Sequence, residues 1–168
     1  MIAYIALGSN LGDRQSNISV GISMLSALGR VTVSPLTVET EDEAGIGPAY
    51  LNTVIKLDAE TADPRTLLEE CLRIEIAVGR DRALPRNAPR VLDLDLIMAG
   101  GWRGHWEWDS PKDLKIFPRL GPRLALDLPH PLAARRDFVL GPLKALSPDQ
   151  WEALTADARP RSIAVGPT

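Results

Sequence analysis

The first part of the chain alternates a short apolar run with apolar residues at helical spacing. Residues 2–7 form an apolar run of strand length, and residues 8–13, GSNLGD, supply turn-forming and helix-capping side chains. Apolar residues then recur every three or four positions up to Gly29, which predicts a helix over residues 13–28. A strand, a tight turn and a helix therefore open the chain.

The next segments predict a second strand and a second helix. Residues 31–39 favour β structure but contain Pro35, and the acidic residues 41–45 predict a loop. Residues 50–57 form the next predicted strand. Asp63 and Pro64 are typical of a helix N-cap and of the first helical position, and this helix is predicted to end near Gly79 with Cys71 in its buried stripe.

The second half of the chain is less regular. A basic loop over residues 80–90 precedes a predicted strand over residues 91–98, which a pair of glycines ends. Residues 102–128 contain three tryptophans and several prolines, and we expect irregular structure there. Short helices are predicted over residues 132–136, 140–146 and 148–154, followed by a loose tail over residues 155–168.

This order of elements predicts one α+β domain over residues 1–168, in which a mainly antiparallel sheet is covered by helices. A chain of 168 residues with 45% apolar and 24% charged residues fits a single globular domain. The net charge of −3 argues against a surface built throughout to hold nucleic acid. No basic leader and no apolar run of about 20 residues is present, so we expect a cytoplasmic protein with no membrane partner.

The counts of cysteine and histidine limit the kind of metal site that is possible. Cys71 is the only cysteine, so an internal disulfide is excluded, and His105 and His130 alone cannot build a histidine-rich zinc site. Any bound metal should therefore be held by carboxylates.

A pair of aspartates lies within the predicted strand over residues 91–98. Side chains alternate faces along a strand, so Asp93 and Asp95 must share one face, roughly 6–7 Å apart at their backbones. Two such carboxylates are suited to Mg²⁺, which commonly binds one or two carboxylates together with substrate phosphates. The alternative is a half-exposed strand whose solvent face happens to be acidic.

The basic loop immediately before this strand strengthens the metal interpretation. A polyphosphate that bridges a metal ion and guanidinium groups would lie between the two segments, because arginine presents a fixed fork of donors that suits phosphate. The alternatives are a solvated loop or a small RNA-contacting patch. The arginines concerned are Arg80, Arg82, Arg86 and Arg90.

Several segments, taken in order, resemble the 6-hydroxymethyl-7,8-dihydropterin pyrophosphokinase family. The resemblance covers about residues 2–146, and the PRVLDLD segment is highly specific to that family. It implies a ferredoxin-like α+β fold, ATP as diphosphate donor, two Mg²⁺ ions and a pterin alcohol as acceptor in folate biosynthesis. The segments that carry it are ALGSNLGDR (6–14), YLN (50–52), Glu75 with Gly79 and Arg80, PRVLDLD (89–95), PHP (129–131) and RDFVL (136–140).

The resemblance also assigns roles to individual residues. Asp93 and Asp95 match the residues that hold both metal ions, and Asp93 also lies against the substrate. Arg80 and Arg90 match phosphate-clamping arginines, and Arg82 matches a mobile arginine of the catalytic loop. The remaining implied contacts are Glu75, His130 and Arg136 with ATP, and Tyr50, Asn52 and Phe138 with the pterin.

The chain departs from the family pattern in three places. Residues 86–88 read RNA where the family usually has tryptophan and glycine before the Pro-Arg pair, so an aromatic lid residue is missing. Residues 41–43, EDE, replace a mostly apolar stretch that helps to wall the pterin pocket. Residues 100–128 enlarge a short hairpin. One hypothesis is that a tryptophan of this enlargement closes over the active site, and the alternative is a packed surface hairpin or a subunit contact; the tryptophans are Trp102, Trp106 and Trp108.

Other functions remain open at this point. The nearest alternative is the same diphosphate chemistry on a modified pterin or another heterocyclic alcohol. A catalytically dead pterin binder and a non-enzymatic ferredoxin-like RNA-binding module are more distant. We expect small-molecule substrates, no nucleic-acid partner, and a monomer or weak homo-oligomer.

Overall fold

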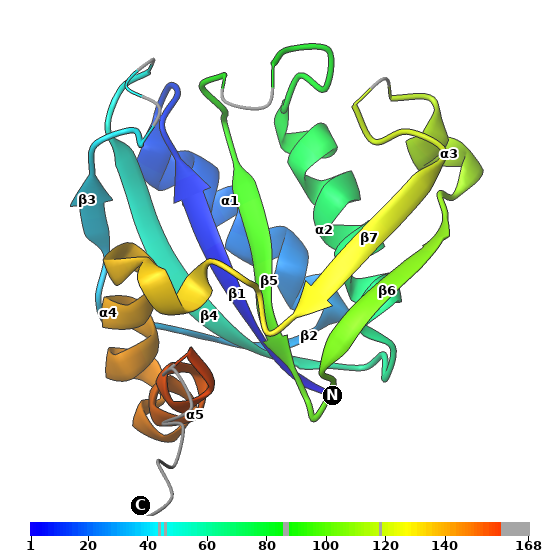
Figure 1. The fold of residues 1–168 in the computed structure, drawn as a ribbon. Helices are drawn as coiled ribbons and strands as arrows, with labels where there is room; N and C mark the ends of the chain where they lie inside the picture. Colours follow the sequence, from blue (N-terminus) through cyan, green and yellow to red (C-terminus); the bar gives the residue numbers. More distant parts are fainter. Residues whose placement is uncertain (44, 46, 86–87, 118, 159–168) are drawn as a thin grey trace, which may run out of the picture.

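The computed structural model describes residues 1–43, 45, 47–85, 88–117 and 119–158. Its central sheet has the strand order β2-β4-β1-β5, with β3 paired to β4 beyond the end of β2, and all neighbouring strands are antiparallel (Figure 1). The strands are β1 (Ile2–Ser9), β2 (Gly29–Val33), β3 (Val38–Thr40), β4 (Tyr50–Ala59) and β5 (Asp93–Ala99).

Helices cover both faces of this sheet (Figure 1). α1 (Arg14–Leu25), which a 3₁₀ turn (Ser26–Leu28) extends, and α2 (Pro64–Val78) pack on one face. α4 (Asp137–Leu146) and α5 (Pro148–Ala158) pack on part of the other face. The order β1-α1-β2-β4-α2-β5 with β1 and β4 at the centre is the ferredoxin-like arrangement, as the resemblance implied.

β1 is an unbroken apolar run because both of its faces are buried. Ile5 and Leu7 point into the core beneath α1 and α2, whereas Tyr4 and Ala6 point into the second core beneath α4 and α5. A strand buried on both faces cannot alternate apolar and polar residues. Because α4 and α5 cover only part of their face, the end of the sheet near Gly8 and Asp93 is left for a site.

The predicted boundaries of α2 are confirmed. The Asp63 carboxylate accepts a hydrogen bond from the Arg65 amide at 2.8 Å, and Pro64 occupies the first turn. Gly79 ends the helix with a φ of 114°, a conformation that favours glycine. Cys71 is fully buried in the core. Desolvation raises the pKa of its thiol, so this cysteine is a core residue.

The expectation of irregular structure over residues 102–128 is wrong. β6 (Gly104–Asp109) and β7 (Arg123–Leu128) form a two-stranded antiparallel sheet, and the short helix α3 (Lys112–Lys115) lies between them. Pro111 and Pro122 lie in the connection, where they do not interrupt a ladder of hydrogen bonds. Leu124, Leu126 and Leu128 are buried in alternation with exposed residues, which is the period of two that a half-buried strand requires.

The C-terminal segments are longer helices than predicted. A 3₁₀ turn (Ala133–Arg135) precedes α4, which begins three residues before the expected position 140. α5 continues to Ala158, so residues 155–158 belong to a helix and not to a tail. Residues 159–168 lie outside the described part of the chain. Among the described helices, none is long and apolar enough to cross a membrane.

Candidate active site

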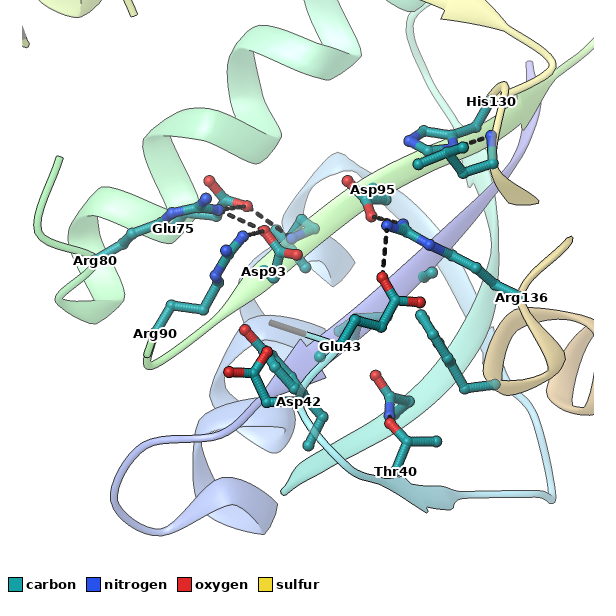
Figure 2. A pocket seen from close by; sticks show the side chains of 18 of the residues that line it. Thr40, Asp42, Glu43, Glu75, Arg80, Arg90, Asp93, Asp95, His130 and Arg136 are labelled. Atoms are coloured by element: carbon teal, nitrogen blue, oxygen red, sulfur yellow. Dashed lines mark hydrogen bonds and ion pairs between the residues drawn. The ribbon is translucent and has the colours of Figure 1, made fainter. Parts of the chain in front are cut away.

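A pocket of about 320 Å³ lies on the uncovered part of the sheet (Figure 2). Its walls come from the end of β1, the loop before β4, the last turns of α2, the loop after α2, the start of β5 and the segment around α4. The structure brings together every site residue named from the sequence: Tyr50, Asn52, Glu75, Arg80, Arg82, Arg90, Asp93, Asp95, His130, Arg136 and Phe138.

Asp93 and Asp95 share one face of β5, as strand alternation predicted. Leu94 between them is buried in the core on the α1 and α2 side, so both aspartates line the pocket on the opposite side. Their partners in β1 are small, since Gly8 pairs with Asp93 and Ala6 pairs with Asp95. A Cβ atom at Gly8 would meet Asn52 Oδ1 at 3.2 Å, so glycine keeps the pocket floor open.

Asp93 is held by two arginines. Its Oδ1 accepts hydrogen bonds from Arg80 Nη1 at 2.6 Å and from Arg90 Nη1 at 3.0 Å (Figure 2). Burial raises the pKa of this carboxyl group, but the two guanidinium groups lower it by more, so the pKa lies below its ordinary value. Asp93 is therefore ionised at neutral pH.

Asp95 has a weaker cationic partner. Arg136 Nη1 lies 3.5 Å from its Oδ2, and about 35% of the Asp95 side chain is exposed to the pocket. Burial, followed by the negative charge of Asp93, raises the pKa of Asp95 to about 7. The pair thus carries negative charge that a cation would stabilise.

The donor set around these aspartates fits a hard cation only in part. Among the described residues, no group of three or more His, Cys, Asp or Glu side chains is placed to hold a metal ion. Two carboxylates are nevertheless enough for Mg²⁺, because this ion usually binds one or two carboxylates and completes its octahedron with water and substrate phosphates. Asp93 and Asp95 are the oxygen donors that the protein would supply.

Glu75 organises the arginines from behind the pocket. Only 2% of its side chain is exposed, and its Oε1 accepts a hydrogen bond from the Leu94 amide at 2.7 Å. It forms ion pairs with Arg80, at 2.7 Å, and with Arg82. Burial and the charge of Asp93 raise the pKa of Glu75 to about 8, against the opposing effect of the two arginines. Because its carboxylate contacts these two arginines, Glu75 positions their guanidinium groups for a ligand.

The other end of the pocket combines aromatic and amide side chains. Asn52 Nδ2 donates to Thr40 Oγ1 at 3.0 Å and to the Val38 carbonyl at 3.3 Å. The Arg136 guanidinium lies 5.5 Å from the centre of the Phe138 ring. Tyr50 lines the same end, and burial raises the pKa of its phenol. Two aromatic rings, of Tyr50 and Phe138, and the side-chain amide of Asn52 therefore line the same end of the pocket.

The acidic segment before β4 borders this end of the pocket. Asp42 Oδ2 accepts a hydrogen bond from the Gly47 amide at 2.9 Å, and Glu43 Oε2 lies 3.5 Å from Arg136 Nη2 (Figure 2). Glu41 lines the pocket as well. The departure from an apolar wall, which the sequence indicated, thus lies at the site itself.

His130 lies on the Arg136 side of the pocket. Its Nδ1 accepts a hydrogen bond from the Leu132 amide at 3.2 Å, and its own amide donates to the Ile97 carbonyl at 2.9 Å. Burial, followed by the charge of Arg136, lowers the pKa of the imidazole. A neutral imidazole can donate or accept a hydrogen bond at this position.

The structure adds Asn10 to the site, a residue to which the sequence interpretation gave no role of its own although it lies in the first turn and in the ALGSNLGDR segment of the resemblance. Asn10 is 1% exposed, and its Oδ1 accepts a hydrogen bond from the Arg90 amide at 2.8 Å. Its Nδ2 donates to the Pro48 carbonyl at 3.1 Å. Asn10 therefore joins the arginine loop to the segment before β4. An asparagine in the turn after β1 was the available signal, but neither its burial nor its partners, which lie far away in the sequence, could be read from it.

The three tryptophans of the enlarged hairpin are absent from the residues that line the pocket. Trp106 and Trp108 pack against the core beneath α1 and α2, and Trp108 Nε1 donates to Glu69 Oε1 on α2 at 2.8 Å. Trp102 and Trp106 contact each other edge to face, with ring centres 5.4 Å apart. The structure therefore favours the alternative of a packed surface hairpin, because Trp106 and Trp108 face the core and none of the three tryptophans lines the pocket. Arg86 and Asn87 lie outside the described residues.

Comparison with known proteins identifies the family. The model of the 7,8-dihydro-6-hydroxymethylpterin-pyrophosphokinase family matches residues 4–148. The chain is 32% identical over 155 residues to the 2-amino-4-hydroxy-6-hydroxymethyldihydropteridine pyrophosphokinase of Methylorubrum extorquens, covering 88% of the chain and 83% of that protein. For the Pseudomonas aeruginosa protein of the same name, identity is 35% over 149 residues, with 87% and 80% covered.

Longer relatives contain the same unit. The chain is 35% identical over 156 residues to the folic acid synthesis protein fol1 of Schizosaccharomyces pombe, and 88% of the chain spans only 18% of that protein. The crystal structure of Plasmodium falciparum HPPK-DHPS superimposes with a TM-score of 0.59 at 13% identity, covering 86% of this chain and 39% of the other. This last likeness supports the fold alone. On the match over residues 4–148, the chain belongs to the 7,8-dihydro-6-hydroxymethylpterin-pyrophosphokinase family.

Proposed function

We propose that the protein transfers a diphosphate group from ATP to the hydroxymethyl group of 6-hydroxymethyl-7,8-dihydropterin, with release of AMP, in folate biosynthesis. Family membership supports the reaction, and relatives carry names for this activity. The single observation that carries the proposal is the juxtaposition of Asp93 and Asp95 with Arg80, Arg90 and a flat polar end within one pocket.

The arginines form the phosphate side of the proposed site. Arg80 and Arg90 already point at Asp93, so a triphosphate entering the pocket meets guanidinium groups on one side and carboxylates on the other. Arg136 and His130 extend the polar wall toward the nucleotide. Transfer of a phosphoryl group depends mainly on positioning and charge neutralisation, which these side chains provide without a nucleophile of the protein's own.

Asp93 and Asp95 are the residues proposed to hold two Mg²⁺ ions. When bound, Mg²⁺ neutralises phosphate charge and polarises the acceptor hydroxyl. The aspartates fix the position of that charge because both belong to one strand, and because Arg80 and Arg90 hold Asp93 in its ionised form. A carboxylate that stays ionised is available to a cation over the whole neutral pH range.

The pterin is proposed to lie at the aromatic end of the pocket. Tyr50 and Phe138 offer faces to the heterocycle, and Asn52 offers its amide to the edge. A second candidate acceptor, a modified pterin or another heterocyclic alcohol with additional hydrogen-bond donors, rests on the acidic side chains of residues 41–43 that line this end of the pocket. The same diphosphate chemistry applies to both acceptors.

The test is an assay of nucleotide products with ATP, Mg²⁺ and a panel of pterin alcohols. Diphosphate transfer releases AMP, whereas ordinary phosphoryl transfer releases ADP. We expect stoichiometric AMP and diphosphorylated pterin with 6-hydroxymethyl-7,8-dihydropterin. ADP as the nucleotide product, or no turnover with any pterin alcohol, would contradict the proposal. The cytoplasmic location, the lack of a nucleic-acid partner and the oligomeric state stay predictions.

A further inference from the structure

Arg136 lies between carboxylates that come from two different walls of the pocket (Figure 2). Its Nη1 is 3.5 Å from Asp95 Oδ2 on β5, and its Nη2 is 3.5 Å from Glu43 Oε2 on the segment before β4. Glu43 and Arg136 are 93 positions apart in the sequence, so only the fold brings them together. One guanidinium group therefore connects the strand that carries the paired aspartates with the acidic segment at the mouth of the pocket.

The fold fixes Arg136 more firmly than it fixes Glu43. The Arg136 carbonyl accepts hydrogen bonds from the Val139 and Leu140 amides at 2.9 Å, so its backbone forms the start of α4. Its side chain is 21% exposed and lies against the Phe138 ring, whereas the Glu43 side chain is 65% exposed. Among the described residues, the Glu43 carboxylate has no hydrogen-bond or ion-pair partner besides Arg136. An anion that approaches Arg136 would therefore displace Glu43 and leave Arg136 in place.

The ion pair is weak enough for a phosphate group to displace it. An exposed ion pair of this kind shifts an equilibrium by at most about fivefold. A phosphate group offers several oxygens to the fork of guanidinium donors and carries more negative charge than one carboxylate. The Glu43 carboxylate can therefore delay the occupation of Arg136 by a phosphate but cannot prevent it.

The contact belongs to the departure of this chain from the family pattern. Residues 41–43 read EDE at the place where the family usually has a mostly apolar stretch. An apolar side chain at position 43 could not form an ion pair with Arg136. The diphosphate transfer itself therefore does not require this contact, and its effect should be specific to chains with an acidic residue here.

We propose that Glu43 competes with the nucleotide for Arg136 and thereby lowers the affinity of this enzyme for ATP. In the unliganded protein the Glu43 carboxylate occupies the guanidinium group, and an incoming phosphate takes its place. The apparent dissociation constant rises as the fraction of molecules with an unpaired Arg136 falls. This inference rests on the proposed function, because that function assigns Arg136 to ATP. Glu43 takes no part in the chemical step, and it sets the ATP concentration at which the pocket fills.

The test is calorimetric titration of the full chain with α,β-methylene-ATP and Mg²⁺, without a pterin, so that turnover plays no part. Glu43→Gln keeps the size of the side chain and removes its charge, and we expect an affinity about two- to fivefold higher than that of the wild type. Glu41→Gln removes a charge from the same pocket-lining segment without removing an ion pair with Arg136, and should give a smaller gain. High NaCl should narrow the difference between Glu43→Gln and the wild type, because salt screens exposed charges.

A second arm repeats these titrations in the Arg136→Ala background. If Glu43 acts through Arg136, Glu43→Gln should raise the affinity there no more than Glu41→Gln does. An equal gain from Glu43→Gln in both backgrounds would show that Glu43 only repels phosphate, and it would overturn the inference. Equal affinities of the wild type and Glu43→Gln would also overturn it and leave the proposed function intact. Absence of analogue binding by the wild type would contradict the proposed function, and the inference with it.

Discussion

The side chain of Asn10 accepts a hydrogen bond from the backbone amide of Arg90 at 2.8 Å, although the two residues are 80 positions apart in the sequence. The backbone amide of Asn10 also donates a hydrogen bond to the Arg90 carbonyl at 3.2 Å. These bonds fix the point at which the arginine loop enters β5. The turn after β1 therefore sets the position of a phosphate-facing guanidinium group.

The first prediction follows from this contact. Asn10→Ala leaves the Arg90 amide and the Pro48 carbonyl without their partner, so we expect a loss of about 1–3 kcal/mol in the free energy of unfolding by urea. ATP affinity should fall as well, because Arg90 loses its anchor. Asn17→Ala, which removes bonds to Ser9 and Leu11 within the same turn, is the matched control. Equal ATP affinity in both variants would show that Asn10 does not position Arg90.

The second prediction concerns Glu75 as the buried anchor of the arginines. Glu75→Ala leaves the Leu94 amide and Arg82 unpaired in the interior, which should cost about 3 kcal/mol or more in urea unfolding. Glu75→Gln keeps an oxygen for the Leu94 amide and should lose less. Glu70→Ala removes a more exposed ion pair from the same helix and should cost below about 1 kcal/mol. A Glu75→Ala cost no larger than that of Glu70→Ala would contradict the assigned role.

The third prediction is a pH dependence caused by Asp95. Its pKa in the folded protein is raised to about 7, so the folded state binds a proton more tightly than the unfolded state between about pH 4 and pH 7. Glu75, whose pKa is raised to about 8, acts in the same direction. Stability of the metal-free protein should therefore decrease as pH rises through this range, and Asp95→Asn should reduce the slope without abolishing it. Asp149→Asn, an exposed aspartate on α5, controls for the loss of one charge.

The same titration predicts how Mg²⁺ binding varies with pH. A proton on Asp95 competes with the cation, so Mg²⁺ affinity should increase as pH rises toward and beyond 7. Calorimetry at several pH values measures this directly. Affinity that is constant from pH 5.5 to 8 would indicate that Asp95 is ionised throughout and that its raised pKa is wrong.

The fourth prediction tests the position of the hairpin tryptophans. Trp108→Phe removes the hydrogen bond to Glu69 but keeps an aromatic ring in the core, so we expect a loss of about 1 kcal/mol in stability. Turnover and the Michaelis constants for both substrates should not change, because Trp108 is not among the residues that line the pocket. A raised Michaelis constant for the pterin would indicate that Trp108 contributes to the pterin site.

The sequence predicted the elements whose signals are local. Asp63 with Pro64 and the glycine at position 79 bound α2 because capping and left-handed backbone conformations depend on a few neighbouring residues. Asp93 and Asp95 could be placed on one face because alternation along a strand is a property of that strand alone. The hairpin strands were not predicted because β7 is only six residues long, and the prolines and tryptophans around it are typical of irregular structure and obscure the alternation of its leucines.

The contacts within the site could not be predicted in the same way. The bonds from Asn10 to Arg90 and from Glu75 to the Leu94 amide join segments that meet only in the folded chain. Such long-range placements are set by packing, and no local pattern encodes them.

The most direct test of the central claim is turnover of Asp95→Asn, measured as AMP release with ATP, Mg²⁺ and 6-hydroxymethyl-7,8-dihydropterin. The substitution keeps the size of the side chain and removes one of the two charges that would hold the cation. We predict a decrease in turnover of about 10² or more, with native-like stability at neutral pH. Turnover within a few-fold of the wild type would contradict the role given to the paired aspartates of β5.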